Sequence, residues 1–142
     1  MRLYERGFRK AHIALLAAGC VLLMSLVPAG AEDATIRSIV EKISAEASKL
    51  SKAARAAHPV VDDIAHEALS LSTTMATLDA AIKREPGEAS SHADALKQLA
   101  ADEINLGLAI TRLSDADAST EKDLTANMAA IADDIKDDAL AY

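Results

Sequence analysis

Apolar residues recur with heptad spacing from residue 36 to residue 82. Two series of residues seven apart, offset by four, make up the pattern: Ile36, Val40, Ile43, Ala47, Leu50, Ala54, Ala57, Val61, Ile64, Ala68, Leu71, Met75, Leu78 and Ile82. Alternating steps of four and three place side chains on one side of an α-helix, as is typical of helices packed at shallow angles. The pattern therefore predicts helix throughout this segment.

Pro59 interrupts the pattern, because proline lacks a backbone N–H and clashes with the preceding helical turn. Asp62 and Asp63 follow it, and acidic residues favour the first turn of a helix. We predict one helix over 35–57 and another over 59–83. The heptad phase continues through the proline, so one long kinked helix over 35–83, packed with two shorter helices, is the open alternative.

Two further helices are predicted after a break at residues 84–88, where Pro86-Gly87 is a turn signal. Ser91 with Asp94 resembles a capping box with Asp in place of Glu, so the third helix is expected at about 92–113.

The last predicted break is at residues 114–118, and the fourth helix is expected at about 119–141. No segment alternates as a β-strand would. The sequence therefore predicts an all-α protein, an up-down-up-down four-helix bundle preceded by an N-terminal signal helix.

Composition agrees with this fold class. Hydrophobic residues make up 51% of the 142 residues, but aromatic residues only 2%, and there are only five Gly and three Pro. Alanine accounts for much of the apolar share, and it favours closely packed helices. The length suits a single domain.

The N-terminus has the three parts of a secretory signal. Four basic residues lie within residues 1–10, residues 11–27 are almost entirely apolar, and small residues stand at Ala29 and Ala31. We predict that residues 1–31 are a signal peptide, cleaved after Ala31. Residues 32–142 then form the bundle domain of a periplasmic or secreted protein.

Two alternatives to cleavage remain open. The apolar run has about 17 residues, the lower limit for crossing a bilayer, so the segment could stay as a membrane anchor. Cys20 follows Leu16-Ala17-Ala18-Gly19, which resembles a lipoprotein box but has Ala17 where Leu is usual. Membrane association is expected only if the segment is retained or lipidated.

The net charge of the chain limits which classes of partner molecule are expected. The net charge is −7, and removing residues 1–31 takes away four of 15 basic and one of 22 acidic residues, leaving −10. An acidic protein repels phosphate backbones, so no nucleic-acid partner is expected. The first predicted helix is basic and the fourth is acidic, which favours placing them as neighbours.

No motif in the sequence supplies a complete set of metal ligands, haem ligands or catalytic residues. His58 and His66 share a helical stripe with Asp62 but lie about 12 Å apart along the axis, too far for one ion. Di-iron bundles need paired Glu-x-x-His motifs, and here only Asp63-x-x-His66 has that spacing. Covalent haem needs Cys-x-x-Cys-His, and Cys20 is the sole cysteine. We therefore predict no cofactor and no enzymatic activity.

The third predicted helix breaks the pattern. Its apolar stripe is formed by Leu96, Leu99, Leu106, Ile110 and Leu113. Glu103 falls inside this stripe and His92 falls on the same side, while Ile104 and Leu108 form a second apolar edge. The helix either tolerates a paired carboxylate in its stripe or rotates to bring Ile104 and Leu108 inward. A carboxylate inside a core is costly unless it is paired or neutral. We expect Glu103 to be buried, and we expect this helix to contact a second copy or another protein.

The leading hypothesis for function is an exported, non-enzymatic helical bundle that acts as a binding or protein-interaction module. One alternative is an amphipathic-helix protein on a membrane or polymer surface, although such helices usually carry bulky aromatic residues. The other alternative is a ligand or cofactor carrier that uses Glu103 and His92.

Overall fold

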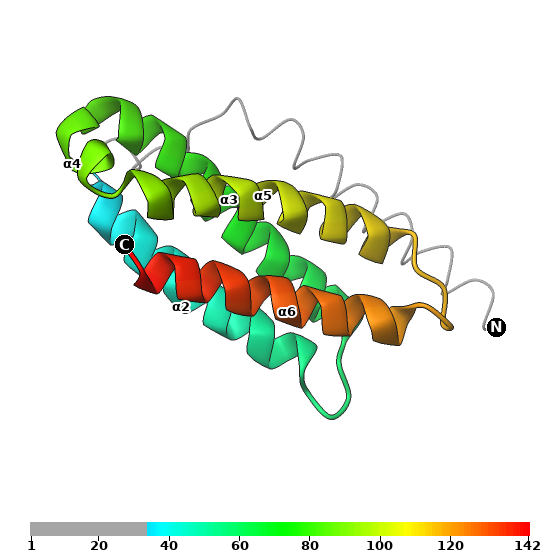
Figure 1. Cartoon of the computed structure of the whole chain (residues 1–142). Coiled ribbons are helices and arrows are strands. Elements are labelled where there is room, and N and C mark those ends of the chain that lie inside the picture. The colour runs from blue at the N-terminus through cyan, green and yellow to red at the C-terminus, as the bar shows by residue number, and fades with distance from the viewer. Residues whose placement is uncertain (1–33) are drawn as a thin grey trace.

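The computed structural model describes residues 34–142. This part of the chain contains no strand, and its helices are α2 (Ile36–Ala54), α3 (Val61–Arg84), α4 (Pro86–Ser91), α5 (Ala93–Ser114) and α6 (Glu121–Leu140) (Figure 1). The all-α prediction is confirmed. The predicted signal peptide, its cleavage residues Ala29 and Ala31, and Cys20 lie outside the described residues.

The four long helices lie along one another, and consecutive ones run in opposite directions (Figure 1). α2 packs against α3 and α6, and α5 packs against the same two helices, so α2 and α5 lie diagonally opposite. The contact between α2 and α6 is the most extensive. No helix in residues 34–142 is long and apolar enough to cross a membrane.

The chain reverses at residues 55–60, so the alternative of one kinked helix is wrong. α2 already ends at Ala54, and α3 begins at Val61. The heptad spacing continues across the loop because Ala54 and Val61, which are both buried, are seven residues apart. The connecting loop takes the place of two helical turns. Ala57, which belongs to the heptad series, is exposed in this loop.

The core is built from the predicted apolar positions. Every member of the heptad series is buried except Ala57 and Ile82, and Ile82 packs at the core's edge. The largest side chains without solvent exposure come from all four long helices: Ile36, Ile43, Leu50, Ile64, Leu71, Leu99, Leu106, Leu113, Met128 and Ile135. Helix periodicity therefore located the core correctly.

The predicted break at residues 84–88 also differs from the structure. Pro86 is the first residue of the short helix α4, so only Glu85 separates α3 from α4. The predicted capping box is wrong: the Ser91 hydroxyl donates to the Gly87 carbonyl at 3.2 Å, and His92 precedes α5 without a side-chain cap. Proline suits this place because the first helical residue needs no N–H partner.

Candidate functional site

Helix α5 holds most of the predicted site residues, and its apolar stripe faces the core. Leu96, Leu99, Leu106, Ile110 and Leu113 are all buried. The helix is therefore not rotated to bring Ile104 and Leu108 inward. Glu103, His92 and the pair of Ile104 and Leu108 instead lie at three different places on the bundle.

Glu103 lies half-buried on the side of α5 that faces α3. Its carboxylate faces Asp79 of α3 rather than a cation, and burial followed by the charge of Asp79 raises the pKa of Glu103. The prediction of a buried Glu103 therefore holds only in part. When it is ionised, the Glu103 carboxylate therefore destabilises the edge of the α3–α5 contact.

The neighbouring residue, Asp102, is the stronger anomaly, and the sequence did not single it out. Asp102 lies on the side of α5 that faces α6, beside Asp138 and Asp134. Its Oδ2 atom is fully covered and has no hydrogen-bond partner among the described residues. Burial, then the hydrogen bond and charge of Asp138, then the charge of Asp134 raise the pKa of Asp102 to about 7.

Two ionised carboxylates have no proton to share, so a hydrogen bond can join Asp102 to Asp138 only when one of them is protonated. A protonated Asp102 can donate to Asp138 and join α5 to α6, whereas an ionised Asp102 repels it. Like charges on the predicted third and fourth helices were visible in the sequence. Their meeting depends on how the two helices are rotated.

Ile104 and Leu108 point outward. Their side chains are 66% and 53% exposed, in the middle of a helix whose other large apolar residues are buried. Five further exposed residues surround them: Lys97, Ala100, Ala101, Thr111 and Arg112. We call these seven residues the α5 outer face. The acidic Asp94 is also exposed, three residues before Lys97.

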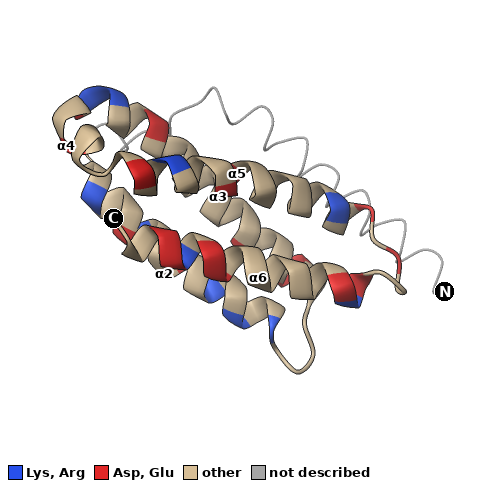
Figure 2. Ribbon diagram, viewed as in Figure 1, with Lys and Arg blue, Asp and Glu red and all other residues tan. Residues whose placement is uncertain are grey.

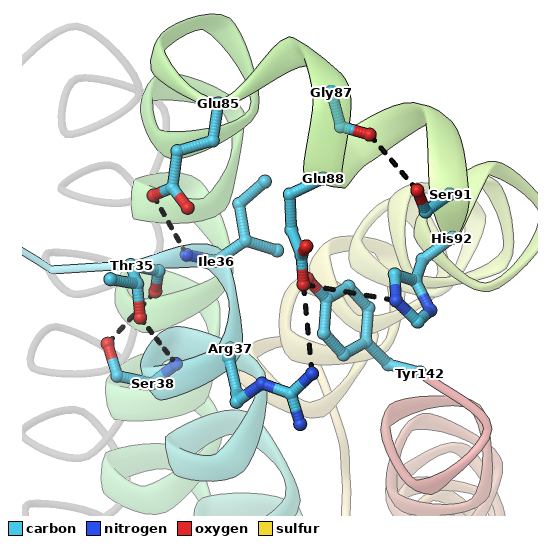
Figure 3. Close-up of polar contacts among 10 residues, drawn as sticks. All are labelled: Thr35, Ile36, Arg37, Ser38, Glu85, Gly87, Glu88, Ser91, His92 and Tyr142. Carbon is cyan, nitrogen blue, oxygen red and sulfur yellow. Dashed lines mark hydrogen bonds and ion pairs between the residues drawn. The ribbon is translucent and has the colours of Figure 1, made fainter.

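His92 lies far from Glu103, at the end of the bundle where the C-terminus meets α4 (Figure 3). Eleven residues separate the two, which corresponds to about 16 Å along a helix. The His92 ring stacks on Tyr142 with ring centroids 4.1 Å apart, and its Nε2 lies 3.9 Å from Glu88 Oε1. The predicted pairing of Glu103 with His92 in one ligand site is therefore not supported.

Glu88 is the centre of this end cluster (Figure 3). Its Oε1 accepts a hydrogen bond from the Tyr142 hydroxyl at 2.8 Å and lies 3.8 Å from the Arg37 guanidinium. Burial, followed by the hydrogen bond to Glu88, raises the pKa of Tyr142 to about 12. Nearby, Glu85 Oε1 accepts the Ile36 backbone N–H at 3.3 Å. The cluster ties the start of α2, α4 and the C-terminus together.

The opposite end of the bundle is hollowed. An open depression of about 910 Å³ lies between the 55–60 loop and the start of α6, with Arg55, His58, Glu121 and Lys122 among its lining residues. Its charges are of both signs, so it does not select a ligand by charge. In residues 34–142 no group of three or more His, Cys, Asp or Glu side chains could hold a metal ion.

The α2–α6 contact is polar as well as apolar. Asp133 of α6 accepts a hydrogen bond from the Ser51 hydroxyl at 2.7 Å and forms an ion pair with Arg55, just after α2. The Ser51 hydrogen bond, followed by the Arg55 charge, lowers the pKa of Asp133. The predicted adjacency of the basic and acidic helices is confirmed.

Comparisons of the chain with protein-family models, with curated proteins and with solved structures found no match.

Proposed function

We propose that the chain is a non-enzymatic interaction protein, exported to the periplasm or secreted, and that it docks a protein partner on the α5 outer face. The observation that carries this proposal is the exposure of Ile104 and Leu108 at mid-helix, while the core stripe of the same helix is complete. An exposed apolar patch edged by polar residues is typical of an interaction surface.

The charges on the α5 outer face indicate the chemistry of its partner. Lys97 and Arg112 stand at its two ends, about 22 Å apart along the helix, and both are exposed. A partner with an apolar centre and carboxylates at its edges matches this arrangement. A second copy docked through the same face does not, because either parallel or antiparallel pairing of two α5 helices brings cations together.

The burial of two aliphatic side chains supplies the gain in such a contact. Covering a side chain of this size contributes about 1.5–3 kcal/mol relative to exposure, before the costs of association are subtracted. This is enough for a recognisable central contact in a small interface, and the two cations then add orientation more than affinity.

Site-specific photo-cross-linking in the producing cells tests the proposal. A photo-reactive residue in place of Ile104 or Leu108 should give a cross-linked protein product of one defined mass. The added substitutions Lys97→Glu and Arg112→Glu should remove that product. The same photo-reactive residue in place of Leu140, which is 68% exposed on α6, is the matched control.

Three results would contradict the proposal. The first is no product at either position in α5, and the second is the same product from position 140. The third is cross-linking to lipid alone, which would favour the membrane-surface alternative. Purified Lys97→Glu/Arg112→Glu protein should keep its stability within about 0.5 kcal/mol, because both residues are exposed, so loss of the product could not be attributed to unfolding.

A further inference from the structure

We propose that the groove between α2 and α6 binds a small molecule that carries a phosphate group. This groove is an open depression of about 570 Å³. Its polar and charged lining residues are Ser48, Ser51, Lys52, Arg55, Asp133 and Lys136. None of them belongs to the α5 outer face, so this site and the proposed docking surface are independent.

The two walls of the groove are the facing sides of two helices. Ser48 and Ser51 precede Arg55 by seven and four residues, so all three lie along the side of α2 that faces α6. Asp133 and Lys136 are three residues apart on the side of α6 that faces α2. The Ser51 hydroxyl donates to Asp133 Oδ1 at 2.7 Å and joins the two walls. Side chains from both helices therefore border the same space.

Asp133 and Arg55 neutralise each other within the groove. Asp133 Oδ1 accepts the Ser51 hydrogen bond, and Oδ2 pairs with the Arg55 guanidinium. The Ser51 hydrogen bond, followed by the charges of Arg55 and Lys136, lowers the pKa of Asp133. The carboxylate therefore stays ionised at neutral pH, and it cancels one of the positive charges that line the groove.

Two lysines supply the remaining charge. Lys52 is exposed and Lys136 is half-buried, and neither forms an ion pair with another residue in the described part of the chain. Figure 2 shows basic residues where α2 leads into the loop that follows it. Three cations and one acid line the groove, which leaves an excess of two positive charges on a chain with a net charge of −7. An anion is attracted here because the nearest charges act on it most strongly.

Acidic residues outside the groove limit the size of the ligand. Glu41 precedes Ser48 by about 10 Å along the axis of α2, and Asp137 lies about 100° further round α6 than Lys136, on its outer side. Both are exposed, and neither lines the groove. A long polyanion would extend across these carboxylates, whereas a single phosphate group stays among the lysines. The surroundings therefore favour a small ligand.

The chemistry of a phosphate group fits the donors of this groove. A phosphate monoester carries a charge of about −1.5 to −2 at pH 7 and has three strong acceptor oxygens, so it matches the excess positive charge. Lys52 and Lys136 each offer three N–H donors, and the exposed Ser48 hydroxyl adds another from the α2 wall. A carboxylate with a single charge would leave half of the excess unmatched. Because the groove is open, we expect binding to weaken as salt is added.

A titration followed by amide NMR tests this inference. The sample is the chain as recovered from expressing cells, with its N-terminus determined from the intact mass. The probes are glycerol phosphate, which is a phosphate monoester, and acetate, each added at constant ionic strength. We expect saturable shifts with glycerol phosphate at amides of residues 48–56 and 129–136, and an affinity at least about tenfold higher than for acetate. No saturable shift, or equal affinities for the two probes, would overturn the proposal.

The charge of the ligand gives a second test. The second pKa of a phosphate monoester is about 6, so lowering the pH from about 7.5 to about 5 removes most of its second charge. We expect the affinity for glycerol phosphate to fall about fivefold or more relative to that for sulfate, which stays doubly charged. The ratio corrects for titration of the protein itself. An unchanged ratio would contradict recognition of a dianion.

A matched pair of variants tests the assignment to this groove. Lys52→Gln/Lys136→Gln protein should bind glycerol phosphate at least about tenfold more weakly than wild type, because it lacks both excess charges. Lys49→Gln/Lys97→Gln protein loses two exposed lysines elsewhere and should bind within about twofold of wild type, because salt screens distant charges. Circular dichroism verifies that both variants are folded. Equal weakening in the two variants, or wild-type affinity in the first, would contradict the proposal.

Vesicles distinguish a small molecule from a membrane as the source of the phosphate group. Wild-type protein should not co-sediment with vesicles of phosphatidylglycerol and phosphatidylcholine. Binding to these vesicles that is lost in Lys52→Gln/Lys136→Gln protein, without binding of glycerol phosphate, would overturn the assignment to a small molecule. Cross-linking from positions 104 and 108 does not depend on this groove, so the two proposals can fail separately.

Discussion

Helices α2 and α5 lie diagonally across the bundle and pack against the same two neighbours, but their polar edges differ. α2 and the residue after it meet α6 through Ser51 and Arg55, both of which contact Asp133. Toward α3, α2 presents Glu46, whose Oε1 accepts the Ser70 hydroxyl at 3.2 Å. α5 instead presents a carboxylate to a carboxylate on both sides.

The comparison shows that an intact apolar core does not make every helix equally stable. Both helices bury complete aliphatic stripes, so their core contributions are similar in kind. At neutral pH both polar edges of α5 oppose its packing. The α6 edge of α2 supports packing, whereas on its α3 edge the Oε2 atom of Glu46 is covered and has no hydrogen-bond partner among the described residues. We expect α5 to open locally more often, and α5 also carries two exposed aliphatic residues near its middle.

The largest expected effect tests whether the two cores are equivalent. Leu50 of α2 and Leu106 of α5 have no solvent exposure. Leu50→Ala and Leu106→Ala should each lower the free energy of unfolding by about 2–5 kcal/mol, because each leaves a cavity. Denaturant unfolding measures this. A loss of less than about 1 kcal/mol in the free energy of unfolding for Leu106→Ala would mean that α5 is poorly packed. The difference between α2 and α5 would then lie in their core packing and not in their polar edges.

Asp102→Asn tests the unfavourable edge between α5 and α6. The pKa of Asp102 is raised from 3.8 to about 7 in the folded protein, so the folded state holds the proton more tightly than the unfolded state. Stability from this group is therefore fully present below about pH 4 and is lost as pH rises toward 7.

Asparagine cannot ionise, so the variant should not lose stability over this range. At pH 8 we expect the free energy of unfolding of Asp102→Asn to be about 1 kcal/mol higher than that of wild type. This value is reduced because solvent reaches part of the carboxyl group. Unfolding curves across a pH series measure the difference. Parallel curves for the two proteins would show that Asp102 is solvated.

Asp133→Asn tests the favourable edge between α2 and α6 and should have the opposite sign. The pKa of Asp133 is lowered in the folded protein, so its contribution is present above the unfolded pKa and is lost on acidification. We expect a loss of about 1 kcal/mol or less at pH 7, since the ion pair is partly exposed. Increased stability of this variant at neutral pH would contradict the contrast between the helices.

Glu103→Gln should give the smallest effect. Burial and the charge of Asp79 raise the pKa of Glu103, so its ionisation also reduces stability as pH rises. We expect stabilisation at pH 8 by a few tenths of a kcal/mol, the scale of a partly screened pair of like charges. Hydrogen exchange of α5 amides is the more sensitive measurement. Faster exchange in this variant would show that Glu103 supports the packing.

The candidate site was less predictable than the fold. Periodicity placed Leu96, Leu106 and Ile110 in the core, and it placed an unusual carboxylate near the middle of this helix. It selected Glu103 instead of Asp102, because the choice depends on which side α6 lies. His92 was assigned to the same site as Glu103, although the short helix α4 and Tyr142 hold it at the end of the bundle.

From its sequence alone, this chain could be assigned to the all-α class, with its core positions and the approximate limits of its long helices. Those features depend on residues three to seven apart and on local signals such as Pro59. The tertiary structure decided that the chain reverses at residues 55–60, that Asp102 meets Asp138, and that Ile104 and Leu108 stay outside the core. These outcomes depend on the rotation and height of one helix against another, which the sum of many distant contacts determines.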